Sequence, residues 1–243
     1  MATTLPKLSV PTYTDYLIST GKEFKYRTFL VGEESKLLLL KEGAEESEMY
    51  NTIQELVEAC TFGELDVTKL PTYDIEHIFV LLRKKSVGEV VDLVVNHGED
   101  AECKHKQEVS LNLNDIVVEN KPDESKSKIL LDKNKGIGIK LRHPNYGDLA
   151  NFGTMNNQFE FLMKIIVLCT EYIYQGDQVF HLKDFTDAEV NEFFAGCSSA
   201  QQLTEVGKFF ENSPKLVYNL KWKCEKCKKE DEVRLEGLKN FLL

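Results

Sequence analysis

Apolar and polar positions alternate with a period of two near the C-terminal end of the chain, which is typical of strands with one buried face. Residues 11–31 carry aromatic side chains of high β-propensity on both sides of the turn segment Ser19–Lys22, in which Gly21 permits a tight turn. We therefore expect an N-terminal β-hairpin. The segments 215–224 and 231–237 alternate with a period of two and predict a second hairpin at the C-terminal end.

Other segments repeat their apolar positions with the helical period of 3.6 residues. Asp74 is a candidate N-cap for one of them, Asp184 or Thr186 for a second, and Ser198 or Ser199 for a third. Gly43 is expected to close the first helix, and Pro214 to stop the last one. The segment 157–174 is the most apolar, so we expect it to be the central core helix. The predicted helices cover residues 32–43, 45–60, 75–87, 157–174, 187–197 and 200–213.

Residues 88–143 differ from the helical parts on either side, because their pattern predicts several strands around a polar loop at 119–128. The expected fold is α+β: a helical core with an N-terminal β-hairpin, a β-rich insertion and a C-terminal hairpin that resembles a zinc ribbon. The predicted parts, which would form one or two compact domains, are 1–87 (hairpin plus helices), 88–143 (insertion), 144–215 (helical core segment) and 216–243 (ribbon-like hairpin).

Charge and hydropathy limit the binding partners and the cellular location that we expect for this protein. The 243 residues carry a formal net charge of −10, and an acidic chain repels phosphate backbones, so nucleic-acid binding is not expected. The longest apolar stretch, 159–169, is too short to span a bilayer. The N-terminus lacks the charged start and apolar block of a secretory signal, and we expect the chain to stay in the cytoplasm.

The six cysteines fall into two groups. Cys60, Cys169 and Cys197 lie in helical patterns, and in a reducing compartment such thiols are usually buried and inert. The other three are Cys103 and the C-x-x-C pair of Cys224 and Cys227.

A short internal repeat relates these three cysteines. Cys227 is followed by KKEDEVRL and Cys103 by KHKQEVSL, so a valine stands six residues and a leucine eight residues after each cysteine. Both segments therefore predict a cysteine turn that leads into an alternating strand. A structural zinc ion needs four Cys or His ligands. Our candidate set is Cys103, Cys224, Cys227 and His105, with His97 or Asp100 as alternatives to His105.

Two interpretations of this motif remain open: a ribbon that binds one structural zinc ion, and a ribbon that keeps its shape without metal. A thioredoxin-like redox role fits poorly, because that motif stands at a helix N-terminus and here strands flank the cysteines. Residues 221–234 carry six basic and four acidic side chains. This small positive excess supports an alternative function, a zinc-ribbon accessory protein that binds nucleic acid.

No catalytic constellation is evident in the sequence. It contains no G-x-S-x-G motif and no pair of histidines four residues apart. Gly136 and Gly138 lack the third glycine of a phosphate-binding loop and are better explained by a twisted strand. The carboxylates occur in runs that are typical of solvent-exposed faces. We expect no catalytic or cofactor-binding residues, and hence no enzyme.

Four segments together resemble the baseplate proteins of T4-type contractile-tailed phages: residues 5–40, 60–90, 136–144 and 223–242. The stretch 60–90 is the most specific of them. The resemblance implies a late-expressed viral protein, either a virion component of the baseplate hub or an assembly chaperone for it. Its partners would be other hub, tail tube or tape-measure proteins. It would reside in the host cytoplasm during assembly and in the tail baseplate of the virion.

A protein that works by contact needs surfaces that become buried on a partner. The aromatic side chains of the two hairpins are our candidates for such contacts, although aromatic residues more often pack in the chain's own core. They are Tyr13, Tyr16, Phe24, Tyr26 and Trp222.

Overall fold

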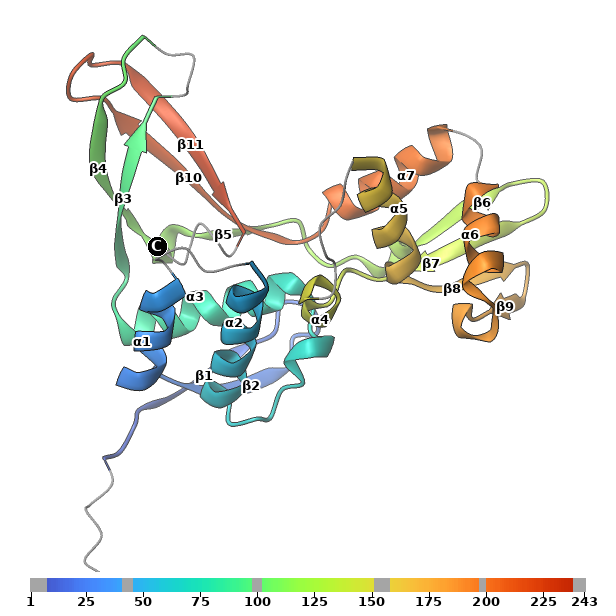
Figure 1. The fold of residues 1–243 in the computed structure, drawn as a ribbon, viewed down its shortest axis with the longest axis horizontal. Helices are drawn as coiled ribbons and strands as arrows, with labels where there is room; N and C mark the ends of the chain where they lie inside the picture. The colour runs from blue at the N-terminus through green and yellow to red at the C-terminus, as the bar shows by residue number, and fades with distance from the viewer. Residues whose placement is uncertain (1–7, 41–45, 98–101, 151–157, 197–199, 238–243) are drawn as a thin grey trace, which may run out of the picture. The chain divides into compact units, whose positions relative to one another are not determined.

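The computed structural model describes residues 8–40, 46–97, 102–150, 158–196 and 200–237. The chain is divided into two compact units, and both combine helices with small antiparallel sheets, so the coarse α+β class is confirmed (Figure 1). Unit 1 comprises residues 1–67, 73–119 and 215–243, and unit 2 comprises residues 68–72 and 120–214. Gly43, Cys197, Ser198 and Ser199, which the sequence analysis singled out, lie outside the described residues.

Unit 1 contains three helices and seven strands among the described residues. The helices are α1 (Val31–Leu40), α2 (Glu46–Cys60) and α3 (Thr72–Ser86). The strands are β1 (Thr12–Tyr16), β2 (Glu23–Arg27), β3 (Val90–Asn96), β4 (Lys106–Asn112), β5 (Val117–Glu119), β10 (Lys215–Lys223) and β11 (Glu230–Glu236). A short 3₁₀ turn occurs at Leu113–Asp115, and another, Val67–Lys69, begins at the last residue of the first segment of unit 1. Helix α3 is central, since Ile75, Ile78 and Leu82 on it are fully buried.

The N-terminal hairpin has the predicted strands and turn: β1 pairs with β2 from Thr12–Arg27 to Tyr16–Glu23. The Asp74 carboxylate holds the turn by accepting hydrogen bonds from the backbone N–H and the hydroxyl of Ser19. Asp74 had been expected to cap a helix that starts at residue 75. Helix α3 instead begins at Thr72, so Asp74 lies in its first turn and is buried. Burial raises the pKa of Asp74, although the bonds from Ser19 oppose that shift.

Two further hairpins of unit 1, β3–β4 and β10–β11, are called the ribbon hairpins below. β3 pairs with β4 from Val90–Asn112 to Asn96–Lys106, and β10 pairs with β11 from Val217–Glu236 to Lys223–Glu230. Figure 1 shows the hairpins side by side, and one hydrophobic core joins them. This core contains buried side chains from both hairpins: Val91, Leu93, Val95, Leu111, Leu216, Leu220, Trp222 and Leu235.

The larger part of unit 2, residues 120–214, is inserted in the sequence between two neighbouring strands of unit 1. Strand β5 pairs with β10, with Glu119 opposite Lys215. The chain therefore leaves unit 1 and returns to it at neighbouring positions. Unit 2 has the strand order β6-β7-β8-β9. Its elements are β6 (Lys128–Asp132), β7 (Ile137–Leu141), β8 (Thr170–Gln175), β9 (Gln178–Phe180), α4 (Tyr146–Ala150), α5 (Gln158–Cys169), α6 (Asp187–Ala195) and α7 (Ala200–Glu211), with 3₁₀ turns at Glu124–Ser127 and Leu182–Asp184.

The segment 157–174, expected to be one long helix, is a helix followed by a strand. Helix α5 ends at Cys169 and β8 begins at Thr170. β8 is rich in β-branched and aromatic residues and pairs with β7, where Ile173 lies opposite the fully buried Ile139. Pairing with an available strand therefore overrides the helical pattern. The predicted cap at Thr186 is confirmed, because its side chain and Glu189 form a capping box at the start of α6.

Gly136 and Gly138, which the sequence analysis assigned to a twisted strand, lie in the β6–β7 connection and in β7 respectively. Gly136 adopts a φ of 65° in the connection, a conformation that suits glycine. A Cβ at Gly138 would collide with the Tyr174 ring and the Ile129 carbonyl, so only glycine fits between those neighbours.

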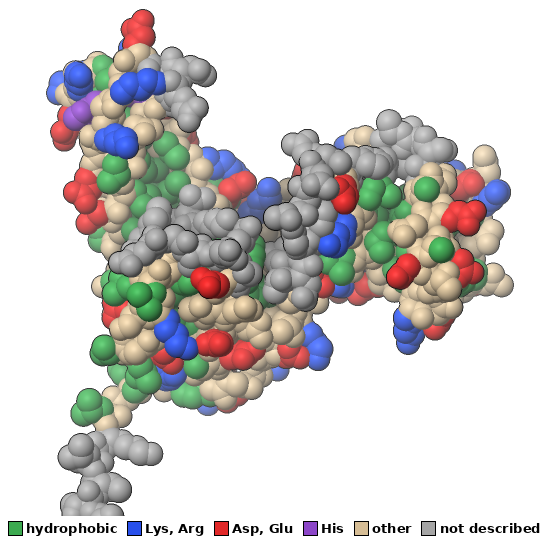
Figure 2. Space-filling model, viewed as in Figure 1, with side chains coloured by type: hydrophobic (Ala, Val, Ile, Leu, Met, Phe, Trp, Pro, Cys, Tyr) green, Lys and Arg blue, Asp and Glu red, His purple; other side chains and the backbone are tan. Residues whose placement is uncertain are grey.

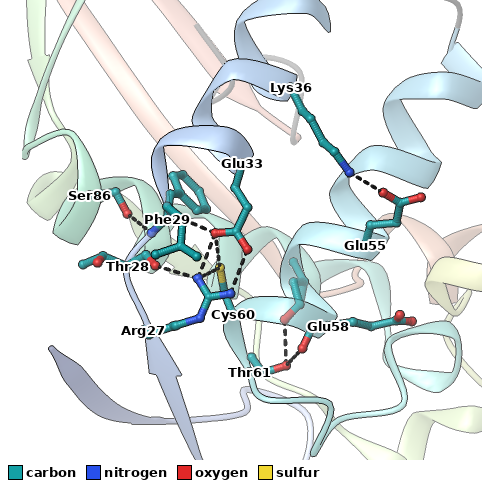
Figure 3. Close-up of polar contacts among 12 residues, drawn as sticks. Arg27, Thr28, Phe29, Glu33, Lys36, Glu55, Glu58, Cys60, Thr61 and Ser86 are labelled. Atoms are coloured by element: carbon teal, nitrogen blue, oxygen red, sulfur yellow. Dashed lines mark hydrogen bonds and ion pairs between the residues drawn. The ribbon is translucent and has the colours of Figure 1, made fainter. Parts of the chain in front are cut away.

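A polar network holds the chain in place where it leaves the N-terminal hairpin after β2 (Figure 3). The Arg27 guanidinium donates two hydrogen bonds to Glu33, of 2.7 and 2.8 Å, and a third to the Thr28 carbonyl. The same Glu33 carboxylate accepts the Leu30 N–H. Both side chains of this ion pair are mostly buried, and the pKa of Glu33 is lowered chiefly by its bond to Arg27. The Lys36–Glu55 ion pair nearby is exposed instead.

We predict that Arg27→Met lowers the free energy of unfolding by about 2 kcal/mol, because it leaves the partly buried Glu33 carboxylate without its partner. The matched control, Lys36→Met, should leave stability unchanged, since exposed ion pairs contribute little. Urea unfolding of both variants checks this. Equal losses in the two variants would contradict it.

The Arg27 contribution should also depend on pH in a defined direction. The folded-state pKa of Glu33 lies below its ordinary value of 4.5, so the pair stabilises the fold above that value. The contribution is lost as the pH falls through the lowered pKa. The stability difference between the wild type and Arg27→Met should therefore be complete near pH 7 and shrink progressively below about pH 4.5.

Candidate metal centre

Four side chains meet at the end of the ribbon hairpins and are called the Cys₃His cluster below: His97, Cys103, Cys224 and Cys227. Their potential ligand atoms, three sulfurs and one imidazole nitrogen, all lie within 4.8 Å of one another. Two of the four residues come from the β3–β4 hairpin and two from the β10–β11 hairpin. The two halves of the cluster are more than a hundred residues apart in sequence, so only the packing of the hairpins brings them together.

The turn between β10 and β11 presents its two sulfurs through its backbone. The Cys224 N–H donates to the Lys229 carbonyl and the Lys228 N–H donates to the Cys224 carbonyl, both at 2.9 Å. Lys228 adopts a φ of 63° to complete this turn. The backbone N–H groups of Cys227 and Lys226 point at the Cys224 sulfur. Such a turn aims N–H groups at a thiolate and fixes its position.

These backbone donors prepare Cys224 for ionisation. The hydrogen bond from the Cys227 N–H is the main reason why the pKa of Cys224 falls to about 6, and His97 adds to the effect. The pKa of Cys227 is raised: the Lys229 N–H favours its thiolate, but desolvation and the neighbouring Cys224 and Cys103 outweigh that donor. Since thiolates are the form that binds metal, a cation would be needed to ionise all three cysteines together.

His97 is held in the orientation of a metal ligand. Its Nδ1 lies 2.7 Å from the Asp231 carboxylate, while Nε2 faces the cluster at 3.3 Å from the Cys227 sulfur. A carboxylate behind a ligating histidine is the usual outer support in metal sites, because it fixes the tautomer and the ring plane. Asp231 is also the main reason why the pKa of His97 is raised.

The cluster has the dimensions of a four-coordinate site. Zinc bonds of about 2.3 Å to sulfur and 2.0 Å to nitrogen imply tetrahedron edges of about 3.8 Å between sulfurs and about 3.5 Å between sulfur and nitrogen. The Cys103 and Cys224 sulfurs are 3.9 Å apart, and the Cys227 sulfur is 3.3 Å from His97 Nε2. The residues present could therefore hold a metal ion with little rearrangement.

Further contacts join the two hairpins beside the cluster. The Gln107 side chain on β4 donates to the Lys223 carbonyl at 3.0 Å and accepts the Glu225 N–H at 2.8 Å. The Trp222 ring lies beneath His97, with ring centroids 4.8 Å apart. A polar clamp and an aromatic contact thus hold the hairpins in register around the cluster.

The structure brings three of the four favoured residues together, namely Cys103, Cys224 and Cys227, but the fourth position is taken by His97 and not by His105. Asp100 lies outside the described residues. The signal that identifies His97 was present in the sequence. Val91, Leu93 and Val95 fill the buried face of β3, and His97 continues this alternation while being only 8% exposed.

The aromatic candidates for partner contact are mostly internal. Phe24, Tyr26 and Trp222 are buried in the core, and Tyr13 is half-buried against Tyr26. Tyr16 is 57% exposed and offers the only ring of this set to a partner. Figure 2 shows Lys and Arg side chains around the end of the ribbon hairpins, where Lys221, Lys223 and Lys226 are exposed.

The fold and this site define the class: a mixed α+β protein with a ribbon-like, metal-competent cluster between two hairpins. A model of the family described as T4 bacteriophage base plate protein matches residues 10–243, and the chain belongs to this family. Comparisons with curated proteins and with solved structures found no match. Among the described helices, none has both the length and the apolar character needed to cross a membrane.

We predict that His97→Ala weakens metal binding by more than about 100-fold, because loss of an outer-shell partner alone typically costs 10–100-fold. His105→Ala is the matched control, two residues beyond Cys103, and should bind metal like the wild type. Competition with a chromophoric chelator measures both affinities. A loss of metal in His105→Ala with retention in His97→Ala would show that the cluster is assigned to the wrong histidine.

Proposed function

We propose that this protein is a structural or assembly component of the baseplate hub and that it acts by contact with other tail proteins and not by catalysis. The observation that carries the proposal is the family match over residues 10–243, which makes the chain a baseplate protein and implies other baseplate or tail proteins as partners. The hub as its location rests on the resemblance of segments such as 60–90. Hub, tail tube and tape-measure proteins are the proposed partners.

We also propose that the Cys₃His cluster holds one structural zinc ion. Three thiolates and one imidazole are a typical donor set for structural zinc, which is usually four-coordinate and closed to substrate. A catalytic zinc keeps one position open for water. The cluster supplies four protein ligands and is half enclosed by the ribbon core, since Cys224 and His97 are buried. This arrangement supports a role in holding the hairpins together.

A protein that acts by binding other proteins needs exposed apolar surface that a partner can cover. Helix α1 has no buried residue, and Val31, Leu38 and Leu39 on it are exposed. Exposed apolar side chains that lie close together are typical of interaction surfaces. Assembly would take place in the host cytoplasm, and the protein would act there or in the tail of the finished virion.

Zinc binding can be tested directly. We expect the purified protein to contain about one zinc ion per chain. Cys224→Ser should reduce this to near zero and lower the melting temperature markedly, because structural zinc contributes directly to folding. Cys60→Ser is the control: it alters a buried cysteine outside the cluster and should keep the metal. Elemental analysis and thermal unfolding are the measurements, and a wild-type protein without metal would refute the zinc proposal.

The contact function predicts a stable complex. Co-expression with the baseplate hub and tape-measure proteins of the same phage should shift the protein to a larger species in gel filtration, with tail proteins in the same fractions. If it elutes alone with each of these partners, the proposed function is wrong.

A further inference from the structure

Unit 2 contains a cleft of about 830 Å³ that is separate from the Cys₃His cluster. It lies between β6 with the segment before it and helix α7, and every lining residue belongs to unit 2. Five lysines line it, and it is called the lysine cleft below: Lys121, Lys126, Lys128, Lys133 and Lys208. Its volume is within the range of sites that bind small molecules or short peptide segments.

The lysine cleft is positively charged in a chain whose formal net charge is −10. Two carboxylates, Asp123 and Glu205, also line it, so five lysines against two acids leave an excess of three positive charges. These acids pair with Lys126 at 3.3 Å and with Lys208 at 2.8 Å. Within the described residues, the three other lysines have no ion-pair partner, and all three side chains are exposed.

Between the lysines the cleft is apolar. Ile129, Leu131 and Phe209 line it from the buried core, and Leu130 is 45% exposed, although a solvated strand would favour a polar residue there. His143 adds no charge at neutral pH, because burial lowers its pKa. Its ring stacks on Phe209 with centroids 4.6 Å apart, and its Nδ1 is 2.9 Å from the Ser213 hydroxyl.

We propose that the lysine cleft binds an acidic, extended segment of another tail protein. Carboxylates of that segment would pair with Lys121, Lys128 and Lys133, and its apolar side chains would cover Leu130 and the floor of the cleft. β6 stands at the end of the strand order β6-β7-β8-β9, a place where an extended segment can lie alongside a sheet. This proposal specifies the chemistry of one partner of the protein. Its biological role rests on the contact function proposed above.

A peptide fits this surface better than a nucleic acid. Sites for single strands provide free aromatic faces on which bases stack, but Phe209 is buried and His143 covers one of its faces. Asp123 and Glu205 would also repel a chain of phosphates, whereas a peptide can place its carboxylates between them.

The test uses a fluorescein-labelled peptide of about ten residues in which glutamates flank leucines, long enough to extend along a strand. A matched peptide carries glutamine in place of glutamate. Fluorescence anisotropy is measured with the wild type, with a cleft variant (Lys121→Gln, Lys128→Gln and Lys133→Gln) and with a control variant (Lys22→Gln, Lys25→Gln and Lys221→Gln). Both variants lose the same three charges, and the control lysines are exposed in unit 1.

We expect the acidic peptide to bind the wild type and the control variant alike, and to bind the cleft variant at least about tenfold more weakly. Added salt should weaken the binding. The proposal is overturned by equal binding of the glutamine peptide, by equal losses in the two variants, by the absence of binding, or by tighter binding of an oligothymidylate of equal charge.

A failure of this cleft proposal can be distinguished from a failure of the proposed hub function. If the protein joins tail complexes but the peptide results fail, only the cleft assignment is wrong. If the peptide binds as expected while the protein joins no tail complex, the cleft stands and the hub function falls.

Discussion

The packing of the two ribbon hairpins against each other is the contact on which unit 1 depends. Cys103 and Cys224, one from each hairpin, are 121 residues apart in sequence, and the whole of unit 2 apart from residues 68–72 lies between them. The entropic cost of closing a loop grows only slowly with its length, so a long insertion is tolerable if its ends are held. They are held by the pairing of β5 with β10 at the point of insertion, and the four side chains of the Cys₃His cluster meet at the far ends of the hairpins.

A metal ion bound by the Cys₃His cluster would add stability to the β3–β4 hairpin. A two-stranded hairpin such as β3–β4 is marginal in water, and it needs a second layer for stability. Val91, Leu93 and Val95 supply apolar contacts along β3, and the next buried residue of the same alternation, at the loop end of the hairpin, is the polar His97. The cluster lies where the hydrophobic core ends, with Gln107 beside it, so ligand bonds could replace burial at that end.

Sequence patterns predicted the elements whose signal is local. The N-terminal hairpin has β-prone aromatic residues around a glycine turn, β10 and β11 alternate over most of their length, and α2 has one apolar face, so each could be recognised without its neighbours. The segment 157–174 was only partly predictable. Its apolar positions continue through Cys169 into Thr170–Gln175, and the change from helix to strand is decided by pairing with β7, a contact that no local pattern contains. Asp74 shows the same limit, since its partner Ser19 belongs to another element.

The residues of the candidate site were likewise predictable only where their signal is local in the sequence. Spacing and the internal repeat pointed to three cysteines, and the structure explains why the repeat works: Val109 and Val233 pack against one core, as do Leu111 and Leu235. Strand register decides which histidine faces the three sulfurs. Register is read from alternation over several residues and not from the distance to the nearest cysteine. Since every second residue of β3 is buried up to His97, the buried face of this strand ends in the cluster, and the same alternation that builds the core also places His97 beside the sulfurs.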